Sequence, residues 1–219
     1  MYLIYYHNEM KRLFFDLFSS FSKQQFSLNY VEFRNTLEIS IFRSMKRVIL
    51  IGFMGAGKST LGKKIAKKMD LPFIDSDHEI EERHQKSIGE IFTENGESFF
   101  RTLETDFISS LHNKEEFVLA TGGGMPCFGK NMELLNELGT TFYLERSPKE
   151  LANRLFNAKT RRPLIDGMEQ EELISFIEDK LSLREEYYKA AQVVLGRDDQ
   201  TVNVIEEFIN LLHPLLQKS

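Results

Sequence analysis

The sequence contains a single cysteine, Cys127, no tryptophan, and only 5 prolines in 219 residues. One cysteine excludes a disulfide within the chain, as is typical of proteins made in a reducing compartment. No apolar run approaches the roughly 20 residues that a membrane-spanning helix needs. The N-terminal region also lacks the uninterrupted apolar centre and small-residue cleavage site of a secretory signal. We therefore expect a cytoplasmic protein with no membrane partner.

An excess of positive charge is also missing, because 33 acidic residues outnumber 28 basic ones and the formal net charge is −5. Such a chain has no general attraction to nucleic acid, so any site for an anion has to be built locally. At 219 residues the chain is long enough for one α/β domain with a substantial core, and too short for two well-grown domains.

Glycine and proline are absent from residues 1–44, which hold seven of the 19 phenylalanines. Phe14, Phe18 and Phe21 have helical spacing. Two interpretations stay open: an extension that is not native to the folded protein, or a weakly ordered amphipathic arm. We place the boundary at Met45, so that residues 1–44 form an N-terminal extension and residues 45–219 form the folded domain.

Residues 52–60 read GFMGAGKST and directly follow the apolar run VILI at 48–51. A segment with helical spacing comes next, which is the strand–loop–helix context of a phosphate-binding loop. The template GxxxxGK[ST] is matched by Gly52, Gly57, Lys58 and Ser59. The sequence therefore predicts a site for a nucleoside triphosphate.

Each part of this loop suits a triphosphate. The glycines allow successive backbone N–H groups to turn toward the β-phosphate, and the following helix adds the positive end of its dipole. Lys58 would reach the β- and γ-phosphates, and the Ser59 hydroxyl would bind Mg²⁺. Thr60 is expected near the α-phosphate. The alternative is a glycine-rich turn that only joins a strand to a helix.

Downstream, short apolar runs alternate with longer stretches of helical spacing. Strands are predicted near 47–51, 72–75, 117–121, 141–145 and 192–196. Helices are predicted near 58–69, 78–86, 98–113, 130–138, 148–157, 170–190 and 202–216. This alternation indicates an α/β fold with a mainly parallel sheet and helices on both faces. Ligands of such folds bind beyond the carboxyl ends of the strands.

Two carboxylates follow the second predicted strand, in the sequence Asp75-Ser76-Asp77. Across from a phosphate-binding loop, Asp75 would hold Mg²⁺ through its water shell, while Asp77 would meet a substrate hydroxyl. The alternative is structural, because Asp77 directly precedes a predicted helix and is a suitable N-cap.

Two further segments can contact a ligand. In GESFFRTLE at 96–104, Arg101 and Glu104 are neighbours on one helical face, so that Glu104 would steer the guanidinium toward an anion. An ordinary exposed ion pair has the same spacing. Gly122, Gly123 and Gly124 follow a predicted strand, where three glycines indicate that a ligand contacts the main chain. A flexible turn is the competing interpretation.

Arginines occupy two later segments. The basic segment KTRRPL at 159–164 lies between predicted helices and would fold over a triphosphate, where it would neutralise charge and exclude water. A solvated basic loop is the alternative. Arg184 lies beside two glutamates, which by itself is typical of an exposed helix face.

Taken together, these segments resemble the shikimate kinase family. The resemblance runs from about Lys46 to about residue 213 and includes the phosphate-binding loop, the DxD at 75–77, GExxFRxxE, GGG, RPL at 162–164 and the late arginine, in the family's order. It implies a three-layer P-loop kinase fold with a central five-stranded parallel sheet and a mobile lid. The implied activity is transfer of the γ-phosphoryl of ATP to the 3-hydroxyl of shikimate, in aromatic amino-acid biosynthesis, by a monomer that uses Mg²⁺.

The resemblance also implies roles for individual residues. The expected catalytic residues are Lys58, Asp77 and the lid arginine Arg162. The expected ATP-binding residues are Gly55, Ala56, Gly57, Lys58, Ser59, Thr60, Arg162, Arg154 and Arg197. The expected shikimate-binding residues are Asp77, Arg101, Gly122, Gly123, Gly124 and Arg184, with both arginines on the substrate carboxylate. Ser59 and Asp75 are expected at the metal.

Two other functions stay open on the sequence. A related small kinase for gluconate or a nucleoside monophosphate would keep the phosphate-binding loop but replace the arginine pair and the glycine triplet. A nucleotide-sensing module without activity would keep the fold and lose Lys58, Asp77 or Arg162, all of which are present.

Overall fold

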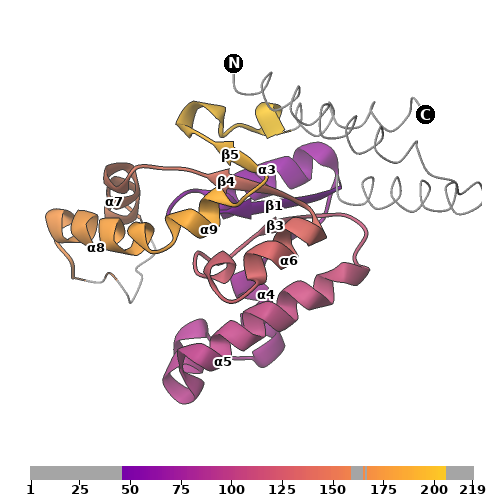
Figure 1. Ribbon diagram of the computed structural model, residues 1–219, viewed down its shortest axis with the longest axis horizontal. Helices are drawn as coiled ribbons and strands as arrows, with labels where there is room; N and C mark the ends of the chain where they lie inside the picture. The colour runs from indigo at the N-terminus through magenta and orange to yellow at the C-terminus, as the bar shows by residue number, and fades with distance from the viewer. Residues whose placement is uncertain (1–45, 159–164, 166, 206–219) are drawn as a thin grey trace, which may run out of the picture. The chain divides into compact units, whose positions relative to one another are not determined.

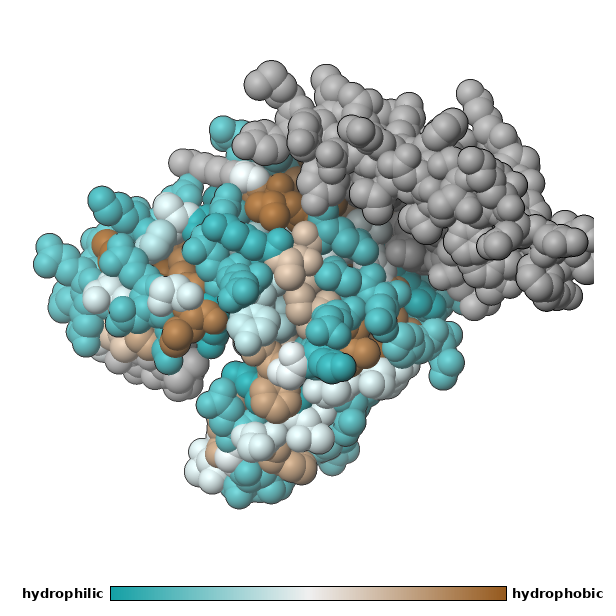
Figure 2. All heavy atoms as spheres, viewed as in Figure 1, coloured by the Kyte–Doolittle hydropathy of each residue, from teal (hydrophilic) through white to brown (hydrophobic). Residues whose placement is uncertain are grey.

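The computed structural model describes residues 46–158, 165 and 167–205. The predictions for residues 1–44 and for Arg162 lie outside this part of the chain. Within it, no helix combines the length and apolarity needed to cross a bilayer. The described surface in Figure 2 is mostly hydrophilic, with apolar groups scattered between polar ones.

A five-stranded parallel sheet forms the centre of the domain (Figure 1), as predicted. Its strands are β1 (Arg47–Ile51), β2 (Phe73–Asp75), β3 (Phe117–Ala120), β4 (Thr140–Leu144) and β5 (Val193–Leu195). They are arranged in the order β2-β3-β1-β4-β5, and every neighbouring pair is parallel. All residues of β1, β3 and β4 are buried, as expected for near-continuous apolar strands covered on both faces.

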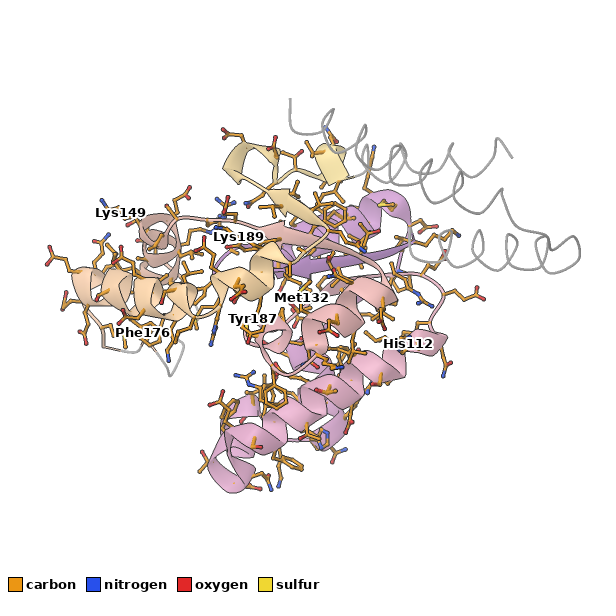
Figure 3. All side chains as sticks on the ribbon, viewed as in Figure 1. His112, Met132, Lys149, Phe176, Tyr187 and Lys189 are labelled. Carbon is orange, nitrogen blue, oxygen red and sulfur yellow. The ribbon has the colours of Figure 1, made fainter. Side chains whose placement is uncertain are left out.

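Helices flank this sheet (Figure 1). They are α3 (Lys58–Met69), α4 (Ser76–His84), α5 (Ile88–Ser110), α6 (Asn131–Leu138), α7 (Pro148–Phe156), α8 (Gln170–Ser182) and α9 (Glu185–Lys189). Short 3₁₀ turns are η1 (Leu111–Asn113), η2 (Met125–Cys127) and η4 (Arg197–Asp199). Helix α3 packs against β1, β2 and β3, and α7 packs against α8. Figure 3 shows Lys149 on α7 and Phe176 on α8 in this helix pair.

The predicted helix 98–113 corresponds to the part of α5 after Gly96, and the helical turns before Gly96 were not predicted. Helix α5 begins at Ile88, because Ser87 and Glu90 form a capping box. At Gly96 the backbone leaves helical geometry (φ 81°, ψ 171°), so the segment consists of two helices joined at a kink. Only the second of them carries the Arg101 motif.

The single helix predicted over 170–190 is also wrong. Helix α8 ends at Ser182 and α9 begins at Glu185, with Leu183 and Arg184 between them. Neither residue is a glycine or proline, so the local sequence holds no signal for this break. The chain turns here because Arg184 lies over the Phe53 ring and Tyr188 is fully buried.

Candidate active site

The loop after β1 has a conformation that depends on glycine. Gly52, Gly55 and Gly57 have φ angles of 140°, 82° and 106°, in a region that side chains with a Cβ rarely adopt. Gly57 is also the N-cap of α3 and provides no side-chain acceptor to the first N–H groups of that helix. These N–H groups therefore face the loop with their dipole directed at an anion.

Lys58 crosses this loop. Its side chain is 8% exposed, and its Nζ donates hydrogen bonds to the carbonyl oxygens of Gly52 at 2.8 Å and Phe53 at 3.0 Å. The ammonium group is thus held inside the curl of the backbone. Phosphate oxygens that enter the loop would meet a fixed positive charge there.

Ser59 and Asp75 lie together, although they come from different elements. The Ser59 hydroxyl donates to Asp75 Oδ2 at 2.7 Å. The other oxygen, Asp75 Oδ1, accepts the Asp77 backbone N–H at 3.2 Å. Asp75 is therefore the N-cap of α4. The alternative that assigned the cap to Asp77 is wrong, because the helix begins two residues earlier than predicted.

A hydroxyl and a carboxylate at this position fit Mg²⁺, which prefers oxygen ligands and keeps several waters. Among the described residues, no group of three or more histidine, cysteine or acidic side chains forms a metal cage. A magnesium ion at Ser59 and Asp75 would take its other ligands from water and phosphate. The donor set of Ser59 and Asp75 thus suits the predicted ion.

Asp77 lies directly against the glycine triplet. A Cβ atom on Gly122 would lie 2.3 Å from Asp77 Oδ1, so only glycine leaves the carboxylate in this place. The Gly122 N–H donates to the buried Ser76 hydroxyl at 2.7 Å, which joins the ends of β2 and β3. Burial raises the pKa of Asp77, and the nearby charge of Asp75 raises it further while Lys58 opposes both.

The other two glycines of the triplet also make close contacts. A Cβ on Gly124 would lie 2.6 Å from Arg101 Nη1 and 2.8 Å from Nη2. A Cβ on Gly123 would lie 3.3 Å from the Met54 backbone nitrogen, and the Gly123 carbonyl accepts the Tyr188 hydroxyl at 2.5 Å. None of the three glycines has a positive φ. They are therefore needed for space and not for backbone freedom.

Arg101 is held by two carboxylates on its own helix. Its Nη1 donates to Glu104 Oε2 at 2.8 Å, and its Nε and Nη2 donate to Glu97 Oε1 at 3.2 and 2.8 Å. Glu104 is 1% exposed and Arg101 is 13% exposed. The alternative interpretation, an ordinary exposed ion pair, is therefore wrong. Burial raises the pKa of Glu104 to about 7 even though Arg101 stabilises the charged form.

Arg184, between α8 and α9, lies near some of the same residues. Its guanidinium lies 5.6 Å from the centre of the Phe53 ring. Burial raises the pKa of Cys127 to about 11, and both Arg184 and Arg101 act to lower it. Arg184 also acts to lower the pKa of Glu104. The two arginines therefore converge, although they lie far apart in the sequence.

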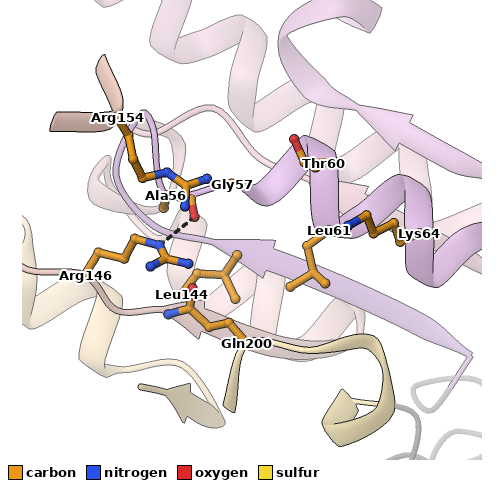
Figure 4. Close-up of a pocket in the computed structure, with 9 residues that line it drawn as sticks. All are labelled: Ala56, Gly57, Thr60, Leu61, Lys64, Leu144, Arg146, Arg154 and Gln200. Carbon is orange, nitrogen blue, oxygen red and sulfur yellow. Dashed lines mark hydrogen bonds between the residues drawn. The ribbon is translucent and has the colours of Figure 1, made fainter. Parts of the chain in front are cut away.

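A pocket of about 140 Å³ lies beside the phosphate-binding loop (Figure 4), and we name it the second pocket to distinguish it from the candidate ligand site at the glycine triplet. Its lining residues are Ala56, Gly57, Thr60, Leu61, Lys64, Leu144, Arg146, Arg154 and Gln200. The Arg154 guanidinium approaches Gly57, where a Cβ would lie 3.0 Å from Nη2. Arg197 begins η4, and its side chain is outside the described part.

Comparison with known proteins places this geometry in a family. The model of the family described as shikimate kinase matches residues 54–213. The chain belongs to the shikimate kinase family. It is 43% identical over 173 residues to the shikimate kinase of Bacteroides fragilis, and the matched segment covers 78% of this chain and 97% of that protein. It is 44% identical over 174 residues to that of Bacteroides thetaiotaomicron, which covers 79% and 99%.

Solved structures agree with this membership. The 1.7 Å crystal structure of shikimate kinase from Bacteroides thetaiotaomicron has a TM-score of 0.68 at 44% identity and covers 78% of this chain and 98% of that one. Shikimate kinase from Acinetobacter baumannii in complex with shikimate has a TM-score of 0.68 at 31% identity and covers 81% and 98%. The family consists of ATP-dependent phosphotransferases of aromatic amino-acid biosynthesis, so this chain is an ATP-dependent phosphotransferase.

The sequence analysis overlooked three polar residues of the second pocket, Lys64, Arg146 and Gln200. Arg146 comes directly after the predicted strand 141–145 and directly before the capping box of Ser147 and Glu150. A residue between a strand end and a helix start lies at the ligand-binding edge of a parallel sheet, so this signal was available. Gln200 follows the last strand and has no comparable motif.

Proposed function

We propose that this member of the shikimate kinase family transfers the γ-phosphoryl of MgATP to the 3-hydroxyl of shikimate, which gives 3-phosphoshikimate and ADP. The observation that carries the proposal is the position of the glycine triplet. It lies between Asp77, the Arg101 guanidinium and the phosphate-binding loop, so that an acceptor bound there is adjacent to a triphosphate. Phosphoryl transfer depends mainly on such alignment and on charge compensation.

The loop of residues 55–60 would hold the phosphates of ATP. Lys58 would exchange the carbonyls of Gly52 and Phe53 for β- and γ-phosphate oxygens. Ser59 and Asp75 would hold Mg²⁺, which when bound neutralises charge on the phosphate oxygens.

Asp77 would accept a hydrogen bond from the 3-hydroxyl and orient it toward the γ-phosphate. The raised pKa of this buried carboxyl makes it a stronger proton acceptor than an ordinary aspartate. Gly122 supports this role because its missing Cβ allows the carboxylate to lie at the end of β3.

Arg101 would grip the carboxylate of shikimate. A guanidinium has five N–H donors, and three of those of Arg101 are directed at Glu97 and Glu104. One donor on each Nη remains, and the edge that joins the two Nη atoms faces Gly124. Two parallel donors on one edge match a carboxylate bidentately. Arg184 would add a second cation from the opposite side.

The proposal extends to three further arginines and to the state of the protein in the cell. Arg162 would close over the γ-phosphate, and Arg154 and Arg197 would contact the nucleoside. We also propose a cytoplasmic monomer without nucleic-acid partners. A chain that starts at Met45 is expected to keep full activity, and a large loss of turnover on removal of residues 1–44 would assign the extension a function.

The test is ADP release by the purified protein with MgATP, with and without shikimate, beside the same assay with gluconate or AMP. Stimulation by shikimate alone, with the product phosphorylated at the 3-hydroxyl and with loss of activity in EDTA, is expected. Stimulation by gluconate or AMP would move the protein to another small-molecule kinase. Absence of stimulation by every acceptor would favour a nucleotide-binding module.

A further inference from the structure

Arg146 makes a contact with the phosphate-binding loop that none of the motifs includes. Its Nε donates to the Ala56 carbonyl at 3.0 Å, shown as the dashed line in Figure 4. Its side chain is 13% exposed. Hydrogen bonds from a charged donor are stronger than neutral ones, and burial strengthens them further. This bond is therefore a firm constraint on one carbonyl of the loop.

Because the peptide group is planar, the bond to the Ala56 carbonyl also fixes the direction of the N–H group that follows it. All described peptide bonds are trans, and in a trans peptide the C=O and the following N–H point in opposite directions. Arg146 holds the Ala56 carbonyl toward the second pocket, so the Gly57 N–H of the same peptide points away from it, into the phosphate-binding loop. Gly57 itself, with φ at 106°, has no side chain that would hold this orientation.

Arg146 is in turn fixed by its own surroundings. Strand β4 pairs with β1 in parallel register, with Ile51 opposite Tyr143, so the residues after β4 run beside the loop. Glu150 Oε1 lies 3.8 Å from Arg146 Nη1. The other oxygen, Glu150 Oε2, accepts the Ser147 N–H and hydroxyl at 3.1 Å each, as part of the capping box of α7. The first turn of α7 therefore holds the Arg146 guanidinium in place through Glu150.

We propose that Arg146 is a positioning residue for nucleotide binding: it orients the Ala56–Gly57 peptide so that the Gly57 N–H faces the β-phosphate. The inference rests on the nucleotide half of the proposed function and assigns this arginine a role different from that of Arg154. Arg154 approaches Gly57 from the pocket side and is suited to contact the nucleoside.

The experiment compares the dissociation constants of ADP and AMP, which differ in the β-phosphate, by calorimetry. Arg146→Met removes the donor, and Arg146→Lys keeps the charge without the planar guanidinium. Lys149→Met is the matched control, because Lys149 is exposed on α7, the helix that begins just after Arg146 (Figure 3). Both Arg146 variants are expected to bind ADP about tenfold more weakly, since one charge-assisted hydrogen bond is worth roughly that factor. AMP affinity should change less than about twofold, and the control should match wild type.

Three results would overturn the proposal. Equal losses for ADP and AMP would show a direct contact with the nucleoside or α-phosphate. Full ADP affinity in Arg146→Lys would show that charge alone matters, and full affinity in Arg146→Met would show that the bond has no role. Thermal unfolding of each variant verifies that it is folded. If Arg146→Met does not fold, the affinity measurement on Arg146→Lys tests the proposal. The ADP measurement needs no acceptor, so it is independent of whether shikimate stimulates turnover.

Discussion

The two halves of the active site are built in different ways. The nucleotide half consists mainly of one continuous segment, residues 52–60, whose backbone groups and Lys58 line the loop. The proposed acceptor half is assembled from α4, α5, the loop after β3 and Arg184 between α8 and α9, and it consists mainly of side chains. In the first half, glycines provide positive φ angles, whereas in the triplet 122–124 they provide space.

This difference predicts how each half fails. On the proposed function, a substitution in the nucleotide half would remove groups that contact the transferred phosphoryl, so we expect loss of the chemical step. A substitution in the acceptor half displaces one side chain among several, so we expect graded losses that affect shikimate more than ATP. Four changes test this contrast.

The largest effect is expected for Lys58→Ala. The variant loses the positive charge held inside the loop, and loss of one such electrostatic group typically costs a factor of at least 10²–10³ in kcat. The measurement is kcat at saturating ATP and shikimate. Lys67→Ala, at an exposed position on the same helix, is the control. Retention of more than a tenth of wild-type turnover by Lys58→Ala would contradict the assignment.

Arg101→Ala and Arg184→Ala should each raise the KM for shikimate by about 100-fold, since a charge-assisted pair with a carboxylate contributes roughly 2–3 kcal/mol. The KM for ATP should change less than about threefold, because the proposed phosphate contacts come from residues 55–60 and not from these two arginines. Steady-state kinetics with each substrate varied in turn separates the two constants. Normal shikimate KM in both variants would disprove the carboxylate grip.

Alanine substitutions at two glycines of the triplet should have different kinetic effects, one mainly on catalysis and the other mainly on shikimate binding. In Gly122→Ala the new methyl group meets Asp77, so we expect mainly a lower kcat, by about tenfold. In Gly124→Ala it meets Arg101, so we expect mainly a higher shikimate KM, also by about tenfold. Gly139→Ala is the contrast, because its methyl group would lie 2.4 Å from the Arg47 backbone oxygen and should lower the unfolding temperature instead. The same kinetic change in both triplet variants would contradict this division.

The last prediction concerns the pH dependence of stability, where the change is gradual and involves no substrate. The pKa of Glu104 is about 7 in the folded protein against 4.5 for an unperturbed glutamate, so between these values the folded state binds more protons than the unfolded state. Stability from this group is therefore lost as pH rises through that window. Relative to Glu104→Gln, wild type should lose on the order of 2 kcal/mol between pH 5 and pH 8.

Urea unfolding of wild type and Glu104→Gln at both pH values measures this difference, and comparison with the variant cancels the contribution of other titrating groups. A difference in unfolding free energy that stays constant with pH would show that Glu104 keeps an ordinary pKa. It would also show that the ion pair with Arg101 fully offsets the effect of burial on the pKa of Glu104.

Local signals were sufficient for most elements. The prediction of β1, the phosphate-binding loop and α3 agrees with the structure, because glycine spacing and helical periodicity are properties of neighbouring residues. The start of α5 at Ile88 was predictable from the Ser87 and Glu90 capping box but was overlooked. The break between α8 and α9 was not predictable, because contacts of Arg184 and Tyr188 with distant residues produce it.

By itself, the sequence determined the family motifs, the parallel α/β class and the chemical types of the site residues, since these depend on short-range patterns. The tertiary structure decided which of those side chains meet. The strand order β2-β3-β1-β4-β5 brings the ends of β2 and β3 to one side of the phosphate-binding loop and the end of β4 to the other. For this reason Asp77 touches Gly122, and Arg146 reaches the Ala56 carbonyl. Each of these contacts joins residues whose separation in the chain is closed only by folding of the sheet.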